Sequence, residues 1–227
     1  IYGNHVGSWN FASTAYLNRW KVKIYYEHYF DDHSQMFFQY GRWKDGHIGL
    51  EITFPKNRFI DTFVYEGLGT KDQTGPMLYD SFWGEFEEQI SAKDNYYNHY
   101  LYQGWQHWGM GIGNPLLPGP IYNKNGQITF ISNRVLAHHI GFCGSPCQSL
   151  SYRMLLSYSR HWGTYDNPLN EIKKQFNSLF EVTYAPQQLK GWSFTVSGAM
   201  DRGSILGNNY GGMLVIRKQG IIKSGNK

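Results

Sequence analysis

Hydrophobic and polar residues alternate with a period of two along most of the chain, as in β-strands that have one apolar and one polar face. In residues 20–30, for example, Trp20, Val22 and Ile24 share one face, and the intervening lysines and tyrosines share the other. Helical periodicity is nearly absent. We therefore predict an all-β protein with eleven strands. They cover residues 8–16, 20–30, 46–54, 59–69, 79–90, 98–108, 127–142, 150–163, 174–186, 191–201 and 208–218.

The lengths of these strands and of their connections favour one kind of β-protein. Several strands reach ten residues, close to the roughly 9–11 that a tilted strand needs to cross a membrane. Short connections (17–19, 55–58, 91–97, 143–147 and 187–190) alternate with long ones (31–45, 70–78, 109–126, 163–173 and 202–207). Outer-membrane barrels have short periplasmic turns and long extracellular loops, whereas a Greek-key sandwich does not require this alternation. We therefore predict an antiparallel transmembrane β-barrel with its long loops outside the cell.

The odd number of predicted strands puts the two ends of the chain on opposite sides of the membrane. Single-chain bacterial barrels have an even number of strands. We therefore expect residues 1–220 to form the C-terminal part of a larger barrel. The missing strands would come from an N-terminal half of the same protein or from another outer-membrane chain, and residues 221–227 would form a tail.

Composition narrows the choice of class without deciding it. Aromatic residues make up 18% of the 227 residues and charged residues 17%, an aromatic content far too high for a disordered chain. No apolar run approaches the 18 residues of a membrane helix, and the mean hydropathy is −0.52. The net charge of +4 has no clustered basic stripe, so we expect no nucleic-acid partner. A carbohydrate-binding sandwich and an outer-membrane barrel both remain compatible with this composition.

Several segments carry specific motifs, above all Gly-Trp-Gln-His-Trp-Gly-Met-Gly at residues 104–111. The others lie at 4–9, 26–32, 65–76, 94–99, 112–116, 133–139, 158–166 and 207–212. Read in order, they resemble the C-terminal half of the Wzi-type capsule-assembly family of Gram-negative outer-membrane proteins, over roughly residues 3–220. The resemblance implies a barrel of about 18 strands that acts as a lectin. It would attach capsular or other surface polysaccharide to the cell and have no enzymatic activity.

Two departures from the family pattern affect this interpretation. The N-terminal half of the family, with its early strands and plug elements, has no counterpart here. The chain also ends at Lys227 and not on an aromatic strand residue. The main alternative is a porin-like channel whose polar lumen passes small solutes.

Aromatic faces stack on pyranose rings and neighbouring amides bind sugar hydroxyls, so a glycan site is expected to combine the two. The best match is a glycine-rich stretch that contains Trp105, His107, Trp108, Asn114, Tyr122 and Asn123. Tryptophan and tyrosine at strand ends are also typical of the aromatic belt at a membrane interface. As a unit, the stretch is equally compatible with a structural plug.

A second candidate glycan site joins a guanidinium, an imidazole, two aromatic rings and a carboxylate: Arg160, His161, Trp162, Tyr165 and Asp166. This set suits an anionic polysaccharide, and its alternative interpretation is a salt bridge at the barrel rim. Asp31, Asp32 and His33 offer too few oxygen ligands for calcium, so we interpret them as solvated loop residues.

The remaining chemistry-bearing residues give no cofactor, metal or catalytic prediction. His138 and His139 are adjacent on a strand, so their side chains point to opposite faces. Cys143 and Cys147 flank a predicted turn, where a disulfide and two free thiols are both compatible, and a zinc site would need two further ligands. The chain has no Gly-x-Ser-x-Gly motif and no evident carboxylate partnered with a base, so we predict that it is not an enzyme.

Overall fold

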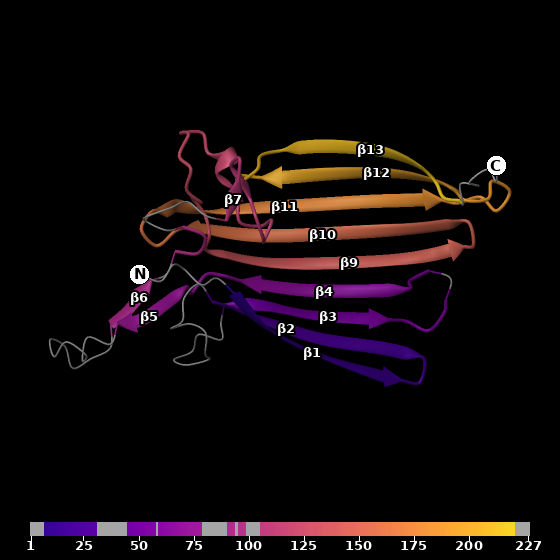
Figure 1. The fold of residues 1–227 in the computed structure, drawn as a ribbon, viewed down its shortest axis with the longest axis horizontal. Helices are drawn as coiled ribbons and strands as arrows, with labels where there is room; N and C mark the ends of the chain where they lie inside the picture. The colour runs from indigo at the N-terminus through magenta and orange to yellow at the C-terminus, as the bar shows by residue number, and fades with distance from the viewer. Residues whose placement is uncertain are drawn as a thin grey trace, which may run out of the picture.

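The fold is dominated by one antiparallel sheet of nine strands (Figure 1). The computed structural model describes residues 7–30, 45–57, 59–78, 90–93, 95–98 and 105–220, and for 74–78 and 90–93 the backbone alone. In sheet order, the strands are β1 (Gly7–Leu17), β2 (Trp20–Phe30), β3 (Gly46–Thr53), β4 (Thr62–Gly69), β9 (Val135–Cys147), β10 (Leu150–Gly163), β11 (Pro168–Tyr184), β12 (Trp192–Gly203) and β13 (Asn209–Lys218). The predicted all-β class and antiparallel sheet are confirmed.

The strand order differs from the prediction between β4 and β9, which are direct neighbours through Gly69 and Leu136. The described residues between these two strands therefore contribute no strand to the large sheet. They contain two small hairpins and a short 3-10 helix: β5 (Thr74–Leu78) with β6 (Ile90–Lys93), β7 (Gln106–His107) with β8 (Met110–Gly111), and η4 (Pro120–Tyr122). Predicted strand 98–108 is wrong over its described part, and predicted strand 127–142 begins at Val135. Residues 79–89 and 99–104 lie outside the described residues.

The connections between the strands lie at two opposite ends of the sheet. At the turn end, residues 18–19, 54–61, 148–149 and 185–191 join the strands. At the loop end, the joining segments are 31–45, 70–134, 164–167 and 204–208. In Figure 1, β5 and β6 lie toward this end, and β7 lies near β11 at the same end. The long loops expected at 163–173 and 202–207 are therefore short, because β11 already begins at Pro168 and β12 extends to Gly203.

The two cysteines occupy one strand. β9 continues through Cys147, and the turn to β10 consists of residues 148–149, so the predicted turn at 143–147 is wrong. Cys143 lies opposite Arg153 and Cys147 lies opposite Leu150. Both thiols are free. The disulfide considered from the sequence is not formed, because the residues that would have flanked a turn are instead spaced along an extended strand.

The sheet has two chemically different faces. One polar row crosses it at a single level, through Tyr25, Gly49, Glu66, His139, Ser157, Asn177, Asp201 and Asn209. We call the face that carries this row the inner face. The opposite, outer face presents exposed apolar side chains from every part of the sheet, including Ile24, Ile48, Ile140, Phe180, Val196 and Leu214.

The hydrophobic core is small and lies at the loop end. Among the described residues, one cluster of buried apolar side chains forms between the inner face and the segment that precedes β9: Leu68, Leu117, Phe130, Val135 and Ala137. We refer to residues 95–98 and 105–134 together as the cap. Because the outer face has no protein layer over it within the described residues, most of the apolar surface of the sheet does not contribute to this core.

Side chains bound to backbone groups hold the cap on the sheet. Asn98 forms a pair of 2.8 Å hydrogen bonds, one from its amide to the Phe130 carbonyl and one from the Phe130 N–H to its oxygen. Asn133 is fully buried and donates to the Tyr96 carbonyl at 2.8 Å. The Asn133 carbonyl accepts from the Thr70 hydroxyl at 2.7 Å. In this segment, which has little regular secondary structure, side chains thus satisfy the buried backbone carbonyls of Tyr96, Phe130 and Asn133.

We predict that Asn133→Ala loosens the cap, because the Tyr96 carbonyl would lose its donor inside the protein. An unsatisfied buried group costs about 1–3 kcal/mol. Native-state hydrogen exchange at the Thr70 and Val135 amides, which pair β4 with the start of β9, measures this loss. Asn125→Ala, in an exposed turn of the same cap, is the matched control, and equal protection in both variants would contradict the role given to Asn133.

Candidate functional site

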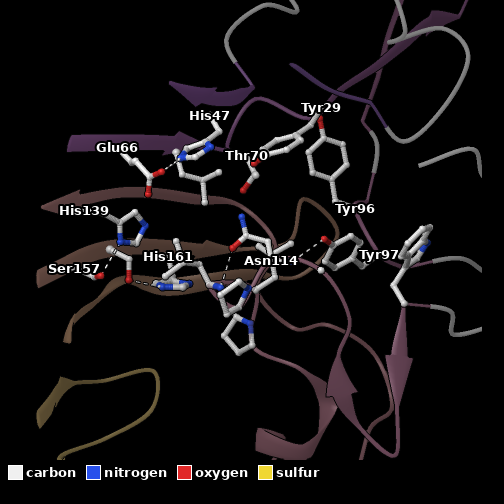
Figure 2. A pocket seen from close by; sticks show the side chains of 18 of the residues that line it. Tyr29, His47, Glu66, Thr70, Tyr96, Tyr97, Asn114, His139, Ser157 and His161 are labelled. Carbon is white, nitrogen blue, oxygen red and sulfur yellow. Dashed lines mark hydrogen bonds and ion pairs between the residues drawn. The ribbon is translucent and has the colours of Figure 1, made fainter. Parts of the chain in front are cut away.

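A cavity of about 890 Å³ lies between the inner face and the cap. Figure 2 shows its two kinds of wall, with the sheet residues His47, Glu66, His139, Ser157 and His161 facing the cap residues Tyr96, Tyr97 and Asn114. The sheet contributes mostly carboxylates, imidazoles and hydroxyls, whereas the cap contributes mostly aromatic and apolar side chains. This volume falls within the roughly 300–1,000 Å³ of ordinary small-molecule sites.

One sheet wall is an acid–imidazole–acid arrangement. His47 on β3 lies between two carboxylates, with Nδ1 3.7 Å from Glu27 Oε2 and Nε2 3.5 Å from Glu66 Oε1. Glu27 also accepts hydrogen bonds from the Ser8 hydroxyl at 2.8 Å and the Tyr29 hydroxyl at 3.2 Å. The carboxylates therefore have fixed positions and give this wall a negative character.

Gly49 makes room for the next part of this wall. It separates Tyr25 on β2 from Glu66 on β4 in the register of the sheet. A Cβ at position 49 would lie 2.0 Å from the Tyr25 ring. Because glycine has no side chain, the ring crosses β3 and its hydroxyl donates to Glu66. His47 packs edge-on against the same ring at 5.7 Å.

The neighbouring strands continue the polar wall with imidazole–hydroxyl pairs. His139 Nδ1 lies 2.6 Å from the Ser157 hydroxyl. His161 Nε2 lies 2.9 Å from the Ser159 hydroxyl, and its Nδ1 lies 3.3 Å from the Ser132 hydroxyl. These contacts orient the imidazoles, so this wall is preorganised.

Gln175 on β11 supplies a donor with no partner. Its Oε1 accepts the backbone N–H groups of Ile205 at 3.3 Å and Leu206 at 3.1 Å, which fixes the orientation of the amide. Its Nε2 is buried without a hydrogen-bond partner among the described residues, and the residue is 2% exposed. Gly203 is required here, because a Cβ at that position would lie 2.5 Å from Gln175 Oε1.

The cap wall is apolar and aromatic. Tyr97 stacks on Trp105 with 5.8 Å between ring centroids and packs edge-on against Phe130 at 5.2 Å. The Tyr97 hydroxyl accepts the Asn114 N–H at 3.2 Å, which connects the stacked rings to the loop that continues through Leu117. Aromatic rings beside a preorganised polar wall form an amphipathic cavity.

Asp45, just before β3, binds the segment that follows β4 and also binds the cap. Its carboxylate accepts the Asp72 N–H at 2.9 Å, the Gln73 N–H at 2.6 Å and the Tyr96 hydroxyl at 3.0 Å. Asp45 is 4% exposed. Burial raises the pKa of Asp45 from 3.8 to about 6, although these three donors oppose the rise.

A raised pKa gives this contact a defined pH dependence. The folded protein holds the Asp45 proton more tightly than the unfolded chain does, so the contribution of Asp45 to stability is greatest below pH 4 and is lost as pH rises through 6. The shift corresponds to about 3 kcal/mol at most. We predict that Asp45→Asn flattens the decline in unfolding free energy between pH 4 and 7, measured by denaturant titration. Asp61→Asn at the turn end is the control, and identical slopes in all three proteins would contradict the prediction.

The structure divides the first predicted glycan site. Trp105, Asn114 and Tyr122 line the cavity. His107 and Trp108 lie at the β7–β8 hairpin away from it, and Trp108 is 83% exposed. Asn123 stabilises its own loop, because its amide donates to the carbonyls of Gln127 at 2.7 Å and Thr129 at 2.8 Å.

His161 lines the cavity, and the other residues of the second predicted site are divided between the outer face of the sheet and the loops at the loop end. Arg160 and Trp162 lie on the outer face of β10, and the Arg160 guanidinium is 5.5 Å from the Trp162 ring. Tyr165 donates to the Asp72 carbonyl at 3.1 Å, and Asp166 accepts from the Asn95 amide at 3.2 Å. The rim salt bridge considered from the sequence does not form between Arg160 and Asp166.

Two more cations join this second site. Lys71 Nζ lies 5.2 Å from the Trp162 ring, and the Arg134 guanidinium lies 3.8 Å from the Tyr165 ring. In the part of the chain that the structure describes, no carboxylate forms an ion pair with Lys71, Arg134 or Arg160. We call Lys71, Arg134, Arg160, Trp162 and Tyr165 the cation–aromatic cluster.

Several cavity residues were missed from the sequence: Glu27, His47, Glu66, His139 and Gln175. The alternation in residues 20–30 placed Glu27 on the polar face, but the gathering of these residues depends on the register of separate strands. The one local signal was Gly49 within an otherwise continuous strand, because glycine inside a strand often marks a close approach.

Comparisons with known proteins add no identity: no protein family, curated protein or solved structure matches the chain. The resemblance to the Wzi-type family therefore stays a prediction. Within the described residues, no helix has the length and apolarity to span a membrane. The same part of the chain contains no group of three or more histidine, cysteine or acidic side chains placed to hold a metal ion.

Proposed function

We propose that the chain forms part of an outer-membrane β-barrel that attaches capsular or other surface polysaccharide to the cell. The observation that carries this proposal is the contrast between the two faces of the sheet. An exposed apolar face on one side and a polar face with an amphipathic cavity on the other are what a barrel wall between lipid and lumen requires.

The outer face supports a membrane environment. Val196 is 60% exposed, and the apolar side chains around it continue across all parts of the sheet. Contiguous apolar surface of this extent is rare on soluble monomers, because it is costly to keep in contact with water. Lipid tails remove that cost without any protein layer.

Strand length and the arrangement of the connections agree with this environment. β1, β2 and β13 have 11, 11 and 10 residues, and β10 has 14. A tilted transmembrane strand needs about 9–11. The excursion 70–134 leaves and re-enters the sheet at one end, which the proposal assigns to the cell surface.

Two features at that end suit polysaccharide. The cavity offers aromatic rings beside hydrogen-bonding groups, the combination that recognises pyranose rings. The cation–aromatic cluster offers Lys71 and Arg160 against one indole ring, where they can contact the carboxylates of an acidic polymer. The cap also lies against the inner face, which favours attachment over free passage of solutes.

We predict that Val196→Arg destabilises the protein in a bilayer by about 2–4 kcal/mol, because it places a charge in the lipid. In water, a substitution at such an exposed position would stay within about 0.5 kcal/mol. Ala199→Arg, three residues along the same strand and exposed on the inner face, is the matched control. Urea unfolding in lipid vesicles measures both, and equal stability would contradict the membrane assignment.

Attachment is tested in encapsulated cells from which the gene has been deleted and then restored. We predict that deletion releases polysaccharide from the cell surface into the medium and that the wild-type gene restores attachment. The double variant Lys71→Gln/Arg160→Gln should restore at least tenfold less attached polymer where the polymer is acidic. The control pair Lys190→Gln/Arg217→Gln removes the same charges outside the cluster and should behave like the wild type.

Normal attachment in the deletion strain would contradict the proposed function. Steady single-channel conductance of the purified protein in planar bilayers, together with normal attachment, would assign the porin-like role instead.

A further inference from the structure

We propose that the cavity binds one uncharged sugar unit of the polymer, with Gln175 donating a hydrogen bond to a sugar oxygen, and that it rejects acidic sugars. This inference rests on the proposed function and specifies which part of the polysaccharide enters the protein.

The unpaired donor is the first argument. Gln175 lines the cavity, and its Nε2 is buried without a partner in the described part of the chain. The two loop amides that hold Oε1 prevent the side chain from reversing. A buried donor without an acceptor costs about 1–3 kcal/mol. A ligand oxygen at this position removes that cost, so the ligand must present a hydroxyl, ring or carbonyl oxygen.

The shape and polarity of the walls are the second argument. A pyranose has apolar C–H faces and a rim of hydroxyls. The cap side offers Tyr97, Leu116 and Leu117 to such a face, and the sheet side offers the hydrogen-bonding groups of Gln175 and His139 to the rim. A sugar would therefore contact both kinds of wall, whereas an acyl chain would leave the Gln175 donor without an acceptor.

The charge of the walls is the third argument, and it separates neutral from acidic sugars. Glu27 and Glu66 line the cavity, and the described lining contains no lysine or arginine. A uronate carboxylate would approach these two carboxylates in a desolvated space, where like charges repel strongly. The acidic units of a polymer would remain outside, near the cation–aromatic cluster.

The test uses the purified full chain in detergent micelles and isothermal titration calorimetry. The probes are the methyl pyranosides of glucose, galactose and mannose, each paired with the uronate of the same configuration. We expect at least one neutral glycoside to bind saturably and its uronate to bind at least tenfold more weakly.

Two variants connect binding to the cavity. Gln175→Glu keeps the oxygen that accepts from Ile205 and Leu206 but removes the Nε2 donor, and we expect at least tenfold weaker binding. Gln187→Glu makes the same change in an exposed turn at the opposite end of the sheet and should bind like the wild type. Leu206→Trp fills the cavity from a loop without altering a strand, so it tests the site even where Gln175→Glu folds poorly.

The inference is overturned if no neutral glycoside binds, if the uronate binds as tightly as its neutral partner, or if neither Gln175→Glu nor Leu206→Trp weakens binding. If the wild-type gene still restores attachment of polymer to the deletion strain, such results would leave the proposed function intact. Failure of the proposed function would appear separately, as normal attachment in the deletion strain without the restored gene.

Discussion

The rest of the structure depends on the environment of the outer face of the sheet. The described residues bury one small apolar cluster, around Phe130 and Val135, whereas apolar side chains from β2 to β13 remain exposed. Burial of apolar surface is the main favourable term in folding, so a sheet of this size needs a second apolar contact. In the proposed outer-membrane setting, lipid at the outer face would provide this contact and leave the inner face free to carry polar groups.

The loop end follows a different physical rule. The cap has little regular secondary structure, so side chains such as Asn98 and Asn133 satisfy its buried backbone groups, and Asp45 accepts a hydrogen bond from the Tyr96 hydroxyl. These contacts hold the aromatic wall at Tyr97 opposite the polar wall at His47 and Glu66. The cavity therefore exists because a rigid sheet and a loop fastened by hydrogen bonds face each other across it.

The strands of the large sheet could be predicted because their alternation is long and uninterrupted, as in residues 20–30 and 150–163, which match β2 and β10. The same signal failed at residues 98–108, where Gln106 and His107 form a two-residue hairpin strand. Trp105 and Asn114 were found from local composition. Glu66 and His139 were not, because their meeting depends on the pairing of β4 with β9 across the whole excursion.

The most direct test of the two-faced membrane sheet is a spin-label scan of residues 194–200 on β12, with the protein in lipid vesicles. Each position in turn carries a nitroxide, and its collisions with oxygen and with a water-soluble nickel complex are measured. The account predicts oxygen collisions that peak at 194, 196, 198 and 200 and fall at 195, 197 and 199. Equal access of the nickel complex to both sets of positions would show that water covers the outer face and would contradict the account.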